Sequence, residues 1–313
     1  MRHTDVCECV SVCLQGVSRA VGCQLLLCTT HFTICPQIIT ALQSLSACFG
    51  SLCCSSSCAH MNLVLTAGDC SQVFADGNVA SGLYVIRPDG SPTALTVYCD
   101  MNNGGGWTVF QRRRDGKESF DRSWVEYKHG FGDLHSPDGE FWLGNDPLHY
   151  LTSQGNYDLR INMEDFEGNQ RYAEYKNFKV DDEKVKQTHY QLHLEEFTGN
   201  AGDALADAHT LSPGGKKWAN PGLGSSGVKF STFDQPNNEA DSQCVRLSKS
   251  GWWFSRCDSG NLNGHYYKGP YEAMTNDGVV WYTWHGWWYS IKSVVMMVRA
   301  VNIDACFDEK REY

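Results

Sequence analysis

The sequence lacks the short motifs that mark the common classes of enzyme. It contains no Gly-x-Ser-x-Gly nucleophile elbow, no zincin helix and no P-loop. A Gly-x-Gly-x-x-Gly pattern occurs at residues 222–227, but Asn220-Pro221 precedes it and no helix-forming run follows it. Dinucleotide binding requires a strand before that pattern and a helix after it. We therefore interpret residues 222–227 as a flexible loop, and we expect neither an enzyme nor a small-molecule substrate.

Charge is scarce at the beginning of the chain. Residues 1–60 hold two basic and two acidic side chains, so the net charge of −10 lies entirely on the remainder. Nucleic-acid binding needs clustered Lys and Arg, and the only basic triplet is Arg112-Arg113-Arg114. We expect no nucleic-acid partner, and we interpret the triplet as the solvated end of a strand.

The first 66 residues also lack a readable fold. They hold ten of the fifteen cysteines, yet no pair of Cys-x2-Cys knuckles for zinc and no heptad repeat for a coiled coil. The stretch from Ala20 to Gly68 has no Asp, Glu, Lys or Arg, but His31 and Pro36 interrupt its apolar runs. Three interpretations of residues 1–66 remain open: a misassigned start, a late secretion signal, or a membrane anchor.

Beyond Cys70 the sequence carries clear local signals. Residues 146–155 predict a short helix, with Asp146 at the cap and Gly155 at the stop. Apolar residues alternate with polar ones from Tyr157 to Met163, and again from Tyr190 to Leu194, as in strands with one solvated face. Residues 291–298 are almost continuously apolar, which is typical of a strand buried on both faces.

Aromatic residues are concentrated near the C-terminus, where six of the ten tryptophans lie between Trp252 and Trp288 among glycines and asparagines. We expect most of these aromatics to be core, and any that are exposed to be interface candidates. The chain resembles the fibrinogen C-terminal domain family from about Cys70 to Arg299. The segments that carry the resemblance are Tyr98-Cys99-Asp100-Met101, Gly104-Gly105-Gly106-Trp107, Gly251-Trp252-Trp253, Asn261-Leu262-Asn263-Gly264 and residues 281–290.

The resemblance implies an α+β fold with a central antiparallel sheet, short helices and a last strand that returns to the sheet. The implied domain spans residues 67–302, followed by a tail at 303–313. Its parts are an N-terminal subdomain at 70–113, a central sheet at 114–200 plus 289–299, and a loop-rich binding subdomain at 201–288.

Two disulfides, Cys70–Cys99 and Cys244–Cys257, are implied by the same resemblance. Disulfides persist in oxidising compartments, so the domain is expected to be extracellular. Cys306 is left over, and both an exposed thiol and an interchain bridge are open for it. The sequence has no Asn-x-Ser/Thr site, so no N-glycan is expected.

Calcium is the usual ion of the resembling family, bound by a run of the form Asp-x-Asp-x-aromatic-x-Gly-x-Cys. Counting back from Cys244, both carboxylates of that run are replaced here. Asn238 and Asp241 remain as candidate calcium ligands because they carry oxygen atoms. We expect a structured turn without calcium.

The family's ligand pocket is altered in the same way. In this chain Leu247-Ser248 stand where the family has a Gln-Asp pair, Asp258 stands where it has a His, and Thr275-Asn276 stand where it has a Tyr-Asp pair. Tyr266 is a sixth candidate pocket residue. Capture of a cationic peptide end needs fixed carboxylates, so we do not expect it here. Loss of the His also weakens acetyl-sugar recognition.

The resemblance therefore implies a secreted, non-enzymatic ligand for a cell-surface receptor protein. Residues 175–180, 198–203 and 280–290 look most like a member that acts on hepatocytes and engages an inhibitory lymphocyte receptor. The alternative is a calcium-dependent lectin for acetylated glycans. Oligomers are possible, although no coiled coil is visible to form them.

Overall fold

The computed structural model describes residues 66–183, 188–205, 227–237, 242–254 and 260–301, which belong to one compact unit, Leu63–Tyr313. Residues 1–65 and the tail from 302 lie outside the described part, so the interpretations of these segments, and of Cys306, stay predictions. In the described ranges, no helix has the length and hydropathy needed to cross a bilayer.

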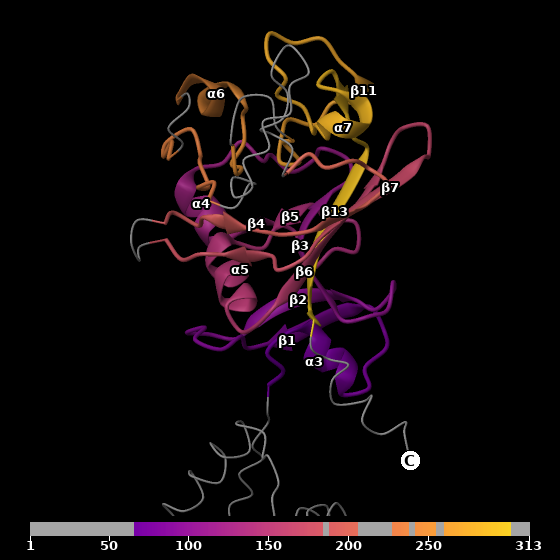
Figure 1. Cartoon of the computed structure of the whole chain (residues 1–313), viewed down its shortest axis with the longest axis vertical. Helices are drawn as coiled ribbons and strands as arrows, with labels where there is room; N and C mark the ends of the chain where they lie inside the picture. Colours follow the sequence, from indigo (N-terminus) through magenta and orange to yellow (C-terminus); the bar gives the residue numbers. More distant parts are fainter. Residues whose placement is uncertain (1–65, 184–187, 206–226, 238–241, 255–259, 302–313) are drawn as a thin grey trace, which may run out of the picture. The chain divides into compact units, whose positions relative to one another are not determined.

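The fold is α+β, as the sequence predicts. One large antiparallel sheet has the strand order β1-β2-β3-β13-β6-β7-β10, and β5 pairs with both β3 and β4 (Figure 1). Its strands are β1 (Gly82–Ile86), β2 (Leu95–Asp100), β3 (Trp107–Arg113), β4 (Phe131–Gly132), β5 (Phe141–Trp142), β6 (Tyr157–Glu164), β7 (Gln170–Tyr175), β10 (Phe197–Gly199) and β13 (Ser293–Ala300).

Two small two-stranded sheets and five short helices complete the described part. These sheets pair β8 (Lys179–Val180) with β9 (Leu192–His193), and β11 (Gly269–Pro270) with β12 (Tyr289–Ser290). The helices are α3 (Cys70–Ala75), α4 (Trp124–His129), α5 (Asn145–Thr152), α6 (Ser242–Leu247) and α7 (Tyr282–His285). In Figure 1, α6, α7 and β11 lie together at one end of the sheet, and α3 lies at the other.

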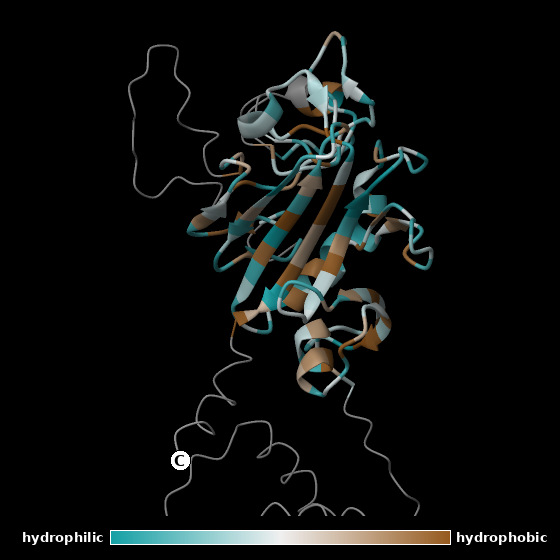
Figure 2. Cartoon of the chain, turned by 90° about the vertical axis from the view of Figure 1, so that its right-hand side faces the viewer, coloured by the Kyte–Doolittle hydropathy of each residue, from teal (hydrophilic) through white to brown (hydrophobic). Residues whose placement is uncertain are grey.

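The last strand, β13, lies in the middle of the large sheet. It pairs with β3 on one side and with β6 on the other, which confirms the expected return of the final apolar run. Its alternate residues Val294, Met296 and Val298 are completely buried in the main core. Figure 2 shows hydrophobic and hydrophilic residues alternating along the strands of this sheet. The pairing joins segments at the two ends of the described chain into one sheet.

The predicted helix and strands exist, with shifted ends. Helix α5 begins at Asn145 with Gly144 as its N-cap, and it ends at Thr152, so neither Asp146 nor Gly155 marks its limits. Strand β6 covers the predicted alternation and extends it to Glu164. The predicted strand around 190–194 is reduced to the two residues of β9, since Tyr190 has a left-handed backbone (φ 55°) that breaks strand geometry.

The interpretation of Arg112-Arg113-Arg114 as a solvated strand end is wrong for two of its three residues. Arg113 is only 1% exposed, and its guanidinium donates to the Leu262 and Gly264 carbonyl oxygens at 3.0 and 2.8 Å. Arg112 is buried as well, while Arg114 is exposed. Strand β3 is buried along its whole length, because chain segments distant in sequence cover its end.

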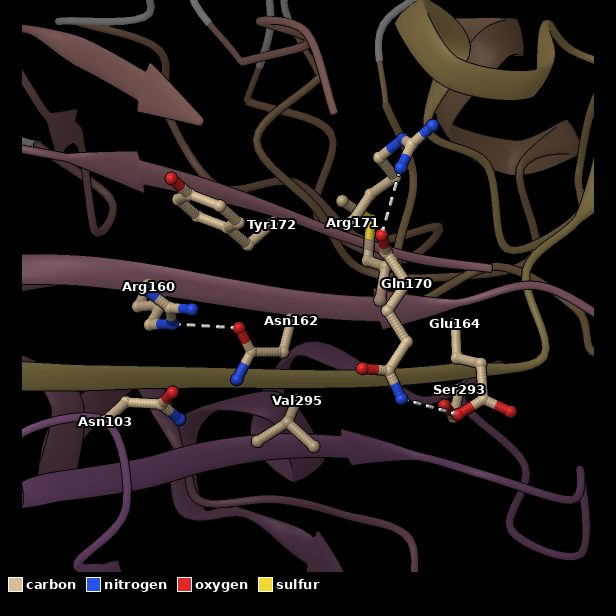
Figure 3. Close-up of a pocket in the computed structure, with 10 residues that line it drawn as sticks. Asn103, Arg160, Asn162, Glu164, Gln170, Arg171, Tyr172, Ser293 and Val295 are labelled. Carbon is tan, nitrogen blue, oxygen red and sulfur yellow. Dashed lines mark hydrogen bonds between the residues drawn. The ribbon is translucent and has the colours of Figure 1, made fainter. Parts of the chain in front are cut away.

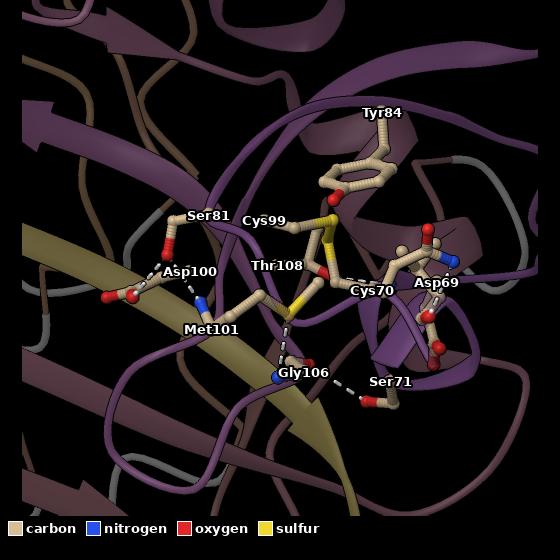
Figure 4. Close-up of a disulfide and its surroundings, with 12 residues drawn as sticks. Asp69, Cys70, Ser71, Ser81, Tyr84, Cys99, Asp100, Met101, Gly106 and Thr108 are labelled. Carbon is tan, nitrogen blue, oxygen red and sulfur yellow. Dashed lines mark hydrogen bonds between the residues drawn. A yellow bond between two sulfur atoms is a disulfide. The ribbon is translucent and has the colours of Figure 1, made fainter. Parts of the chain in front are cut away.

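A disulfide joins Cys70 of α3 to Cys99 of β2, as the resemblance implies (Figure 4). Both cysteines are completely buried in a small apolar cluster. The Ser71 hydroxyl donates to the Gly106 carbonyl oxygen at 3.0 Å, which fixes α3 against the glycine run. Gly106 has φ +75°, and a Cβ there would lie 3.1 Å from the Ser71 Cα, so this close approach requires glycine.

Candidate functional site

The loop-rich end brings together two of the predicted pocket segments. The Thr275 hydroxyl lies 3.4 Å from the Leu247 carbonyl oxygen, so the C-terminal end of α6 contacts the loop after β11. Ser248 and Asn276 are the neighbours of these two residues in sequence, and both are engaged in interactions. Asp258 lies outside the described residues, and so its place in the predicted pocket is untested.

Tyr266 has a different position. Its hydroxyl lies 2.6 Å from the Arg114 carbonyl oxygen and 2.7 Å from the Lys292 carbonyl oxygen, at the ends of β3 and β13. Burial raises the pKa of Tyr266 to about 12, which keeps the hydroxyl a donor at neutral pH. The contacts of this side chain attach the loop to the sheet rather than line a pocket with Leu247.

The calcium prediction falls on Asn238 and Asp241, which both lie outside the described residues. Nearby, Asp234 is already engaged: its carboxylate accepts from the Trp124 backbone N–H at 2.9 Å and from the Thr232 hydroxyl at 2.7 Å. Within the described ranges, no group of three or more His, Cys, Asp or Glu side chains converges on a point that could hold a metal.

The predicted Cys244–Cys257 disulfide stays a prediction. Cys257 lies outside the described residues, and Cys244 is described only as part of the backbone of α6.

A buried carboxylate that the sequence analysis missed is Asp277. It lies one position after the predicted pair Thr275-Asn276, and its side chain is only 1% exposed. The Tyr267 hydroxyl donates to Asp277 Oδ1 at 3.0 Å, and the Lys249 ammonium lies 2.8 Å from Oδ2. The signal that could have found it was an acidic residue adjacent to the matched position, combined with a lysine two residues after Leu247.

A framework of aromatic rings supports this end of the domain. The rings of Tyr267 and Tyr271 stack at 4.3 Å, and those of Tyr282 and Trp287 stack at 5.0 Å. The Tyr271 hydroxyl donates to the Trp287 carbonyl oxygen at 2.7 Å, which links the two stacks. Rings held by both stacking and hydrogen bonds lose little entropy when a partner binds.

Fewer of the C-terminal aromatics are core than predicted. Of the six tryptophans between Trp252 and Trp288, Trp252, Trp253 and Trp281 are buried, but the other three, Trp284, Trp287 and Trp288, are half-buried or exposed. Trp288 is 48% exposed and borders an open hollow of about 590 Å³, whose other lining residues are Pro270, Tyr271, Glu272 and Ala273.

Four large apolar side chains are exposed in the loop-rich part, namely Phe233, Leu247, Met274 and Trp288, and we call the last three the apolar tip. Leu247 is 50% exposed, and Met274 is fully exposed. Met274 follows Ala273, which lines the hollow with Trp288, and precedes Thr275, whose hydroxyl contacts Leu247. Exposed Trp and Met on a rigid support are typical of protein-binding surfaces.

Comparisons with known proteins agree with this architecture. The family model described as "Fibrinogen beta and gamma chains, C-terminal globular domain" matches residues 66–301. Fibrinogen-like protein 1 of Bos taurus is 53% identical over 231 residues, which cover 74% of this chain and 71% of the relative. The Homo sapiens protein of the same name gives the same identity and coverage.

Solved structures give the same result. The fibrinogen-like globe domain of human ANGPTL2 matches with a TM-score of 0.65 and 37% identity, over 75% of this chain and 99% of that one. Lamprey fibrin D-dimer, complexed with the peptide ligand Gly-His-Arg-Pro-amide, matches with a TM-score of 0.67 and 35% identity, over 85% of this chain and 84% of that one. The chain therefore belongs to the fibrinogen C-terminal domain family.

Proposed function

We propose that this protein is a secreted, non-enzymatic ligand that recognises a cell-surface receptor protein through the apolar tip. The observation that carries the proposal is the exposure of Leu247, Met274 and Trp288 on a stacked aromatic support. A few well-supported apolar anchors supply most of the affinity in protein interfaces.

The electrostatics of the same end favour an apolar partner over a cationic peptide end. Among the described residues, the carboxylate next to the predicted pair Thr275-Asn276, Asp277, is buried and already paired with Lys249. An incoming amine would have to displace an ion pair that is intramolecular and therefore costs no association entropy. Affinity at this surface must then come from burial of apolar area.

The similarity to fibrinogen-like protein 1 supports a finer proposal. We propose that the receptor-bearing cells are hepatocytes, on which the protein acts as a growth or metabolic factor, and lymphocytes that carry an inhibitory receptor. The family relationship also supports the proposal that the chain acts by binding rather than by catalysis.

The test is binding of the full-length chain, expressed in animal cells and collected from the medium, to hepatocytes and to activated lymphocytes. The double variant Met274→Ser/Trp288→Ser is expected to lose about tenfold or more in affinity, because each anchor contributes at least about 1 kcal/mol. The matched control is Val79→Ser/Val125→Ser, which removes two exposed apolar side chains outside the tip.

Equal loss in the control and tip variants would contradict the assignment to the tip. Retention of the chain on an acetyl-sugar column, abolished by a chelator, would instead support the calcium-dependent lectin alternative. No binding to either cell type and none to acetyl sugars would refute both functions.

A further inference from the structure

The open face of the large sheet carries a shallow trough, separate from the apolar tip. Two adjoining hollows of about 320 and 380 Å³ form it, and they share Glu164, Ser293 and Val295. Figure 3 shows the first hollow, with side chains from β6, β7 and β13 standing on the sheet. The trough thus crosses β3, β13, β6 and β7, which is roughly 14 Å at the usual strand spacing.

The lining of the trough is basic, although the chain as a whole has a net charge of −10. Its lining includes one carboxylate, Glu164, and six cationic residues. The guanidinium of one of them, Arg113, is buried against the Leu262 and Gly264 carbonyl oxygens, and the other five are Arg112, Arg114, Arg160, Arg171 and Lys292. Three carboxylates that are not part of the lining, Asp138, Glu140 and Glu174, form ion pairs with cations of the lining. The six cations therefore still outnumber the four carboxylates. Among the described residues, no carboxylate lies within ion-pair distance of Arg112 or Arg171.

The ion pairs at the rim of the trough can be exchanged at little cost. Arg114 pairs with Asp138, and their side chains are 53% and 66% exposed. Exposed pairs of this kind contribute only about 0–1 kcal/mol. A sulfate offered to the same guanidinium would form a charge-assisted, bidentate contact that replaces the pair.

Neutral hydrogen-bonding groups lie between the charges. Within the described part, the Asn103 amide and the Ser293 and Tyr172 hydroxyls have no hydrogen-bond partner for their side chains, and all three line the first hollow. Apolar lining is limited to Met163, Val295 and Pro137. Protein interfaces need an apolar centre, which this surface lacks, whereas hydroxyl-rich ligands need scattered polar groups of this kind.

We propose that the trough binds an extended sulfated polysaccharide of the glycosaminoglycan class. Arg114, Arg160 and Arg171 hold sulfate groups, and Asn103, Tyr172 and Ser293 hold sugar hydroxyls. The binding requires no calcium, because the lining offers cations and amides rather than converging carboxylates. It tethers the protein to matrix polysaccharide while leaving the apolar tip, on loops outside the trough lining, free for a receptor.

The test uses the full-length chain, a heparin hexasaccharide as the probe and a chelator throughout. The double variant Arg114→Gln/Arg171→Gln is expected to weaken binding by about tenfold or more, since hydrogen bonds to charged groups contribute about 1.5–3 kcal/mol each. The control Arg87→Gln/Arg246→Gln removes the same charge from exposed positions outside the trough lining and should bind as the parent does. Thermal unfolding of both variants should match the parent.

Three results would overturn the proposal. The first is absence of heparin binding by the parent chain at physiological salt. The second is an equal loss in the control, which would show attraction by overall charge alone. The third is equally tight binding of a polyglutamate peptide of the same charge, which would indicate an acidic protein partner instead of a sugar.

Discussion

The Lys249 ammonium lies 2.8 Å from the Asp277 carboxylate, which is almost fully buried beneath the loop-rich end. Lys249 makes this contact from a left-handed backbone conformation (φ 47°), which is costly for a residue with a Cβ. The carboxylate in turn raises the pKa of Lys249 through a hydrogen bond. The ion pair therefore offsets local strain and fixes the α6 segment to the loop that carries Met274.

Replacement of Lys249 by Met should destabilise the fold by about 1–2 kcal/mol. The substitution leaves a buried carboxylate without its cation, but the half-exposed ammonium limits the loss. Urea denaturation of Lys249→Met, Asp277→Asn and the double variant gives the coupling energy. The exposed Lys268→Met is the control and should be neutral. Additive losses in the double variant would show that the two side chains are not energetically coupled.

Neighbouring arginines of the basic triplet should differ sharply in their effect on stability. Arg113→Ala removes the ionic partner of the buried Glu140, leaves the Gly264 carbonyl oxygen without its donor, and leaves the Leu262 carbonyl oxygen with Gln111 as its remaining donor. The expected cost is about 3–5 kcal/mol, as for a broken buried ion pair. Arg114→Ala is the matched control and should stay within about 0.5 kcal/mol. Similar denaturation midpoints for the two variants would refute the structural role of Arg113.

Sequence patterns predicted the parts of the fold that depend on local periodicity. Cap and stop residues predicted helix α5, alternation predicted strand β6, and a continuous apolar run predicted strand β13, whose return to the sheet was implied by the family resemblance. The burial of Arg113 could not be predicted in this way, since the segment that covers it lies about 150 residues further along the chain.

The candidate site was harder to predict for a related reason. Matching positions to a family motif found Leu247 and Thr275, which are in contact. It missed Asp277 because the acidic residue is displaced by one position, and only the fold shows that Lys249 reaches it. It also placed Tyr266 in the pocket, although hydrogen bonds to the ends of two strands hold that side chain elsewhere. The positions of Asp277 and Tyr266 therefore depend on partners that are distant in sequence, which matching to a motif does not reveal.

Loss of the Cys70–Cys99 disulfide should destabilise the domain by about 3–4 kcal/mol. The bridge closes a loop of 29 residues, and it restricts the unfolded chain by roughly that free energy in the loop-entropy account. Cys70→Ser/Cys99→Ser should therefore unfold at lower denaturant than the parent, and reductant should lower the midpoint of the parent by more than that of the variant, in which only the predicted Cys244–Cys257 bridge is left to reduce. A variant that is as stable as the oxidised parent would show that α3 is held by its hydrogen bonds alone.

The free energy of unfolding should depend on pH through Asp165, which lies in the turn between β6 and β7. Burial alone would raise the pKa of this carboxyl, but hydrogen bonds from the Asn169 side chain and backbone and from His285 outweigh burial and lower the pKa below its usual value. A carboxyl with a lowered folded-state pKa contributes stability above about pH 4, its unfolded pKa, and the contribution is lost as pH falls further. The conservative variant Asp165→Asn should cost about 1–2 kcal/mol at pH 7.

That cost should shrink towards zero at the lowest pH at which the parent still folds, because the parent carboxyl is then protonated and resembles the amide. Chemical denaturation of parent and variant across pH 2.5–7, a range set by the reference pKa of Asp, measures the difference directly. Glu272→Gln, which changes an exposed carboxylate that accepts no hydrogen bond from the described residues, is the control and should show no such difference at any pH. A constant difference between parent and Asp165→Asn at every pH would mean that the ionised form of Asp165 is not what stabilises the turn against α7.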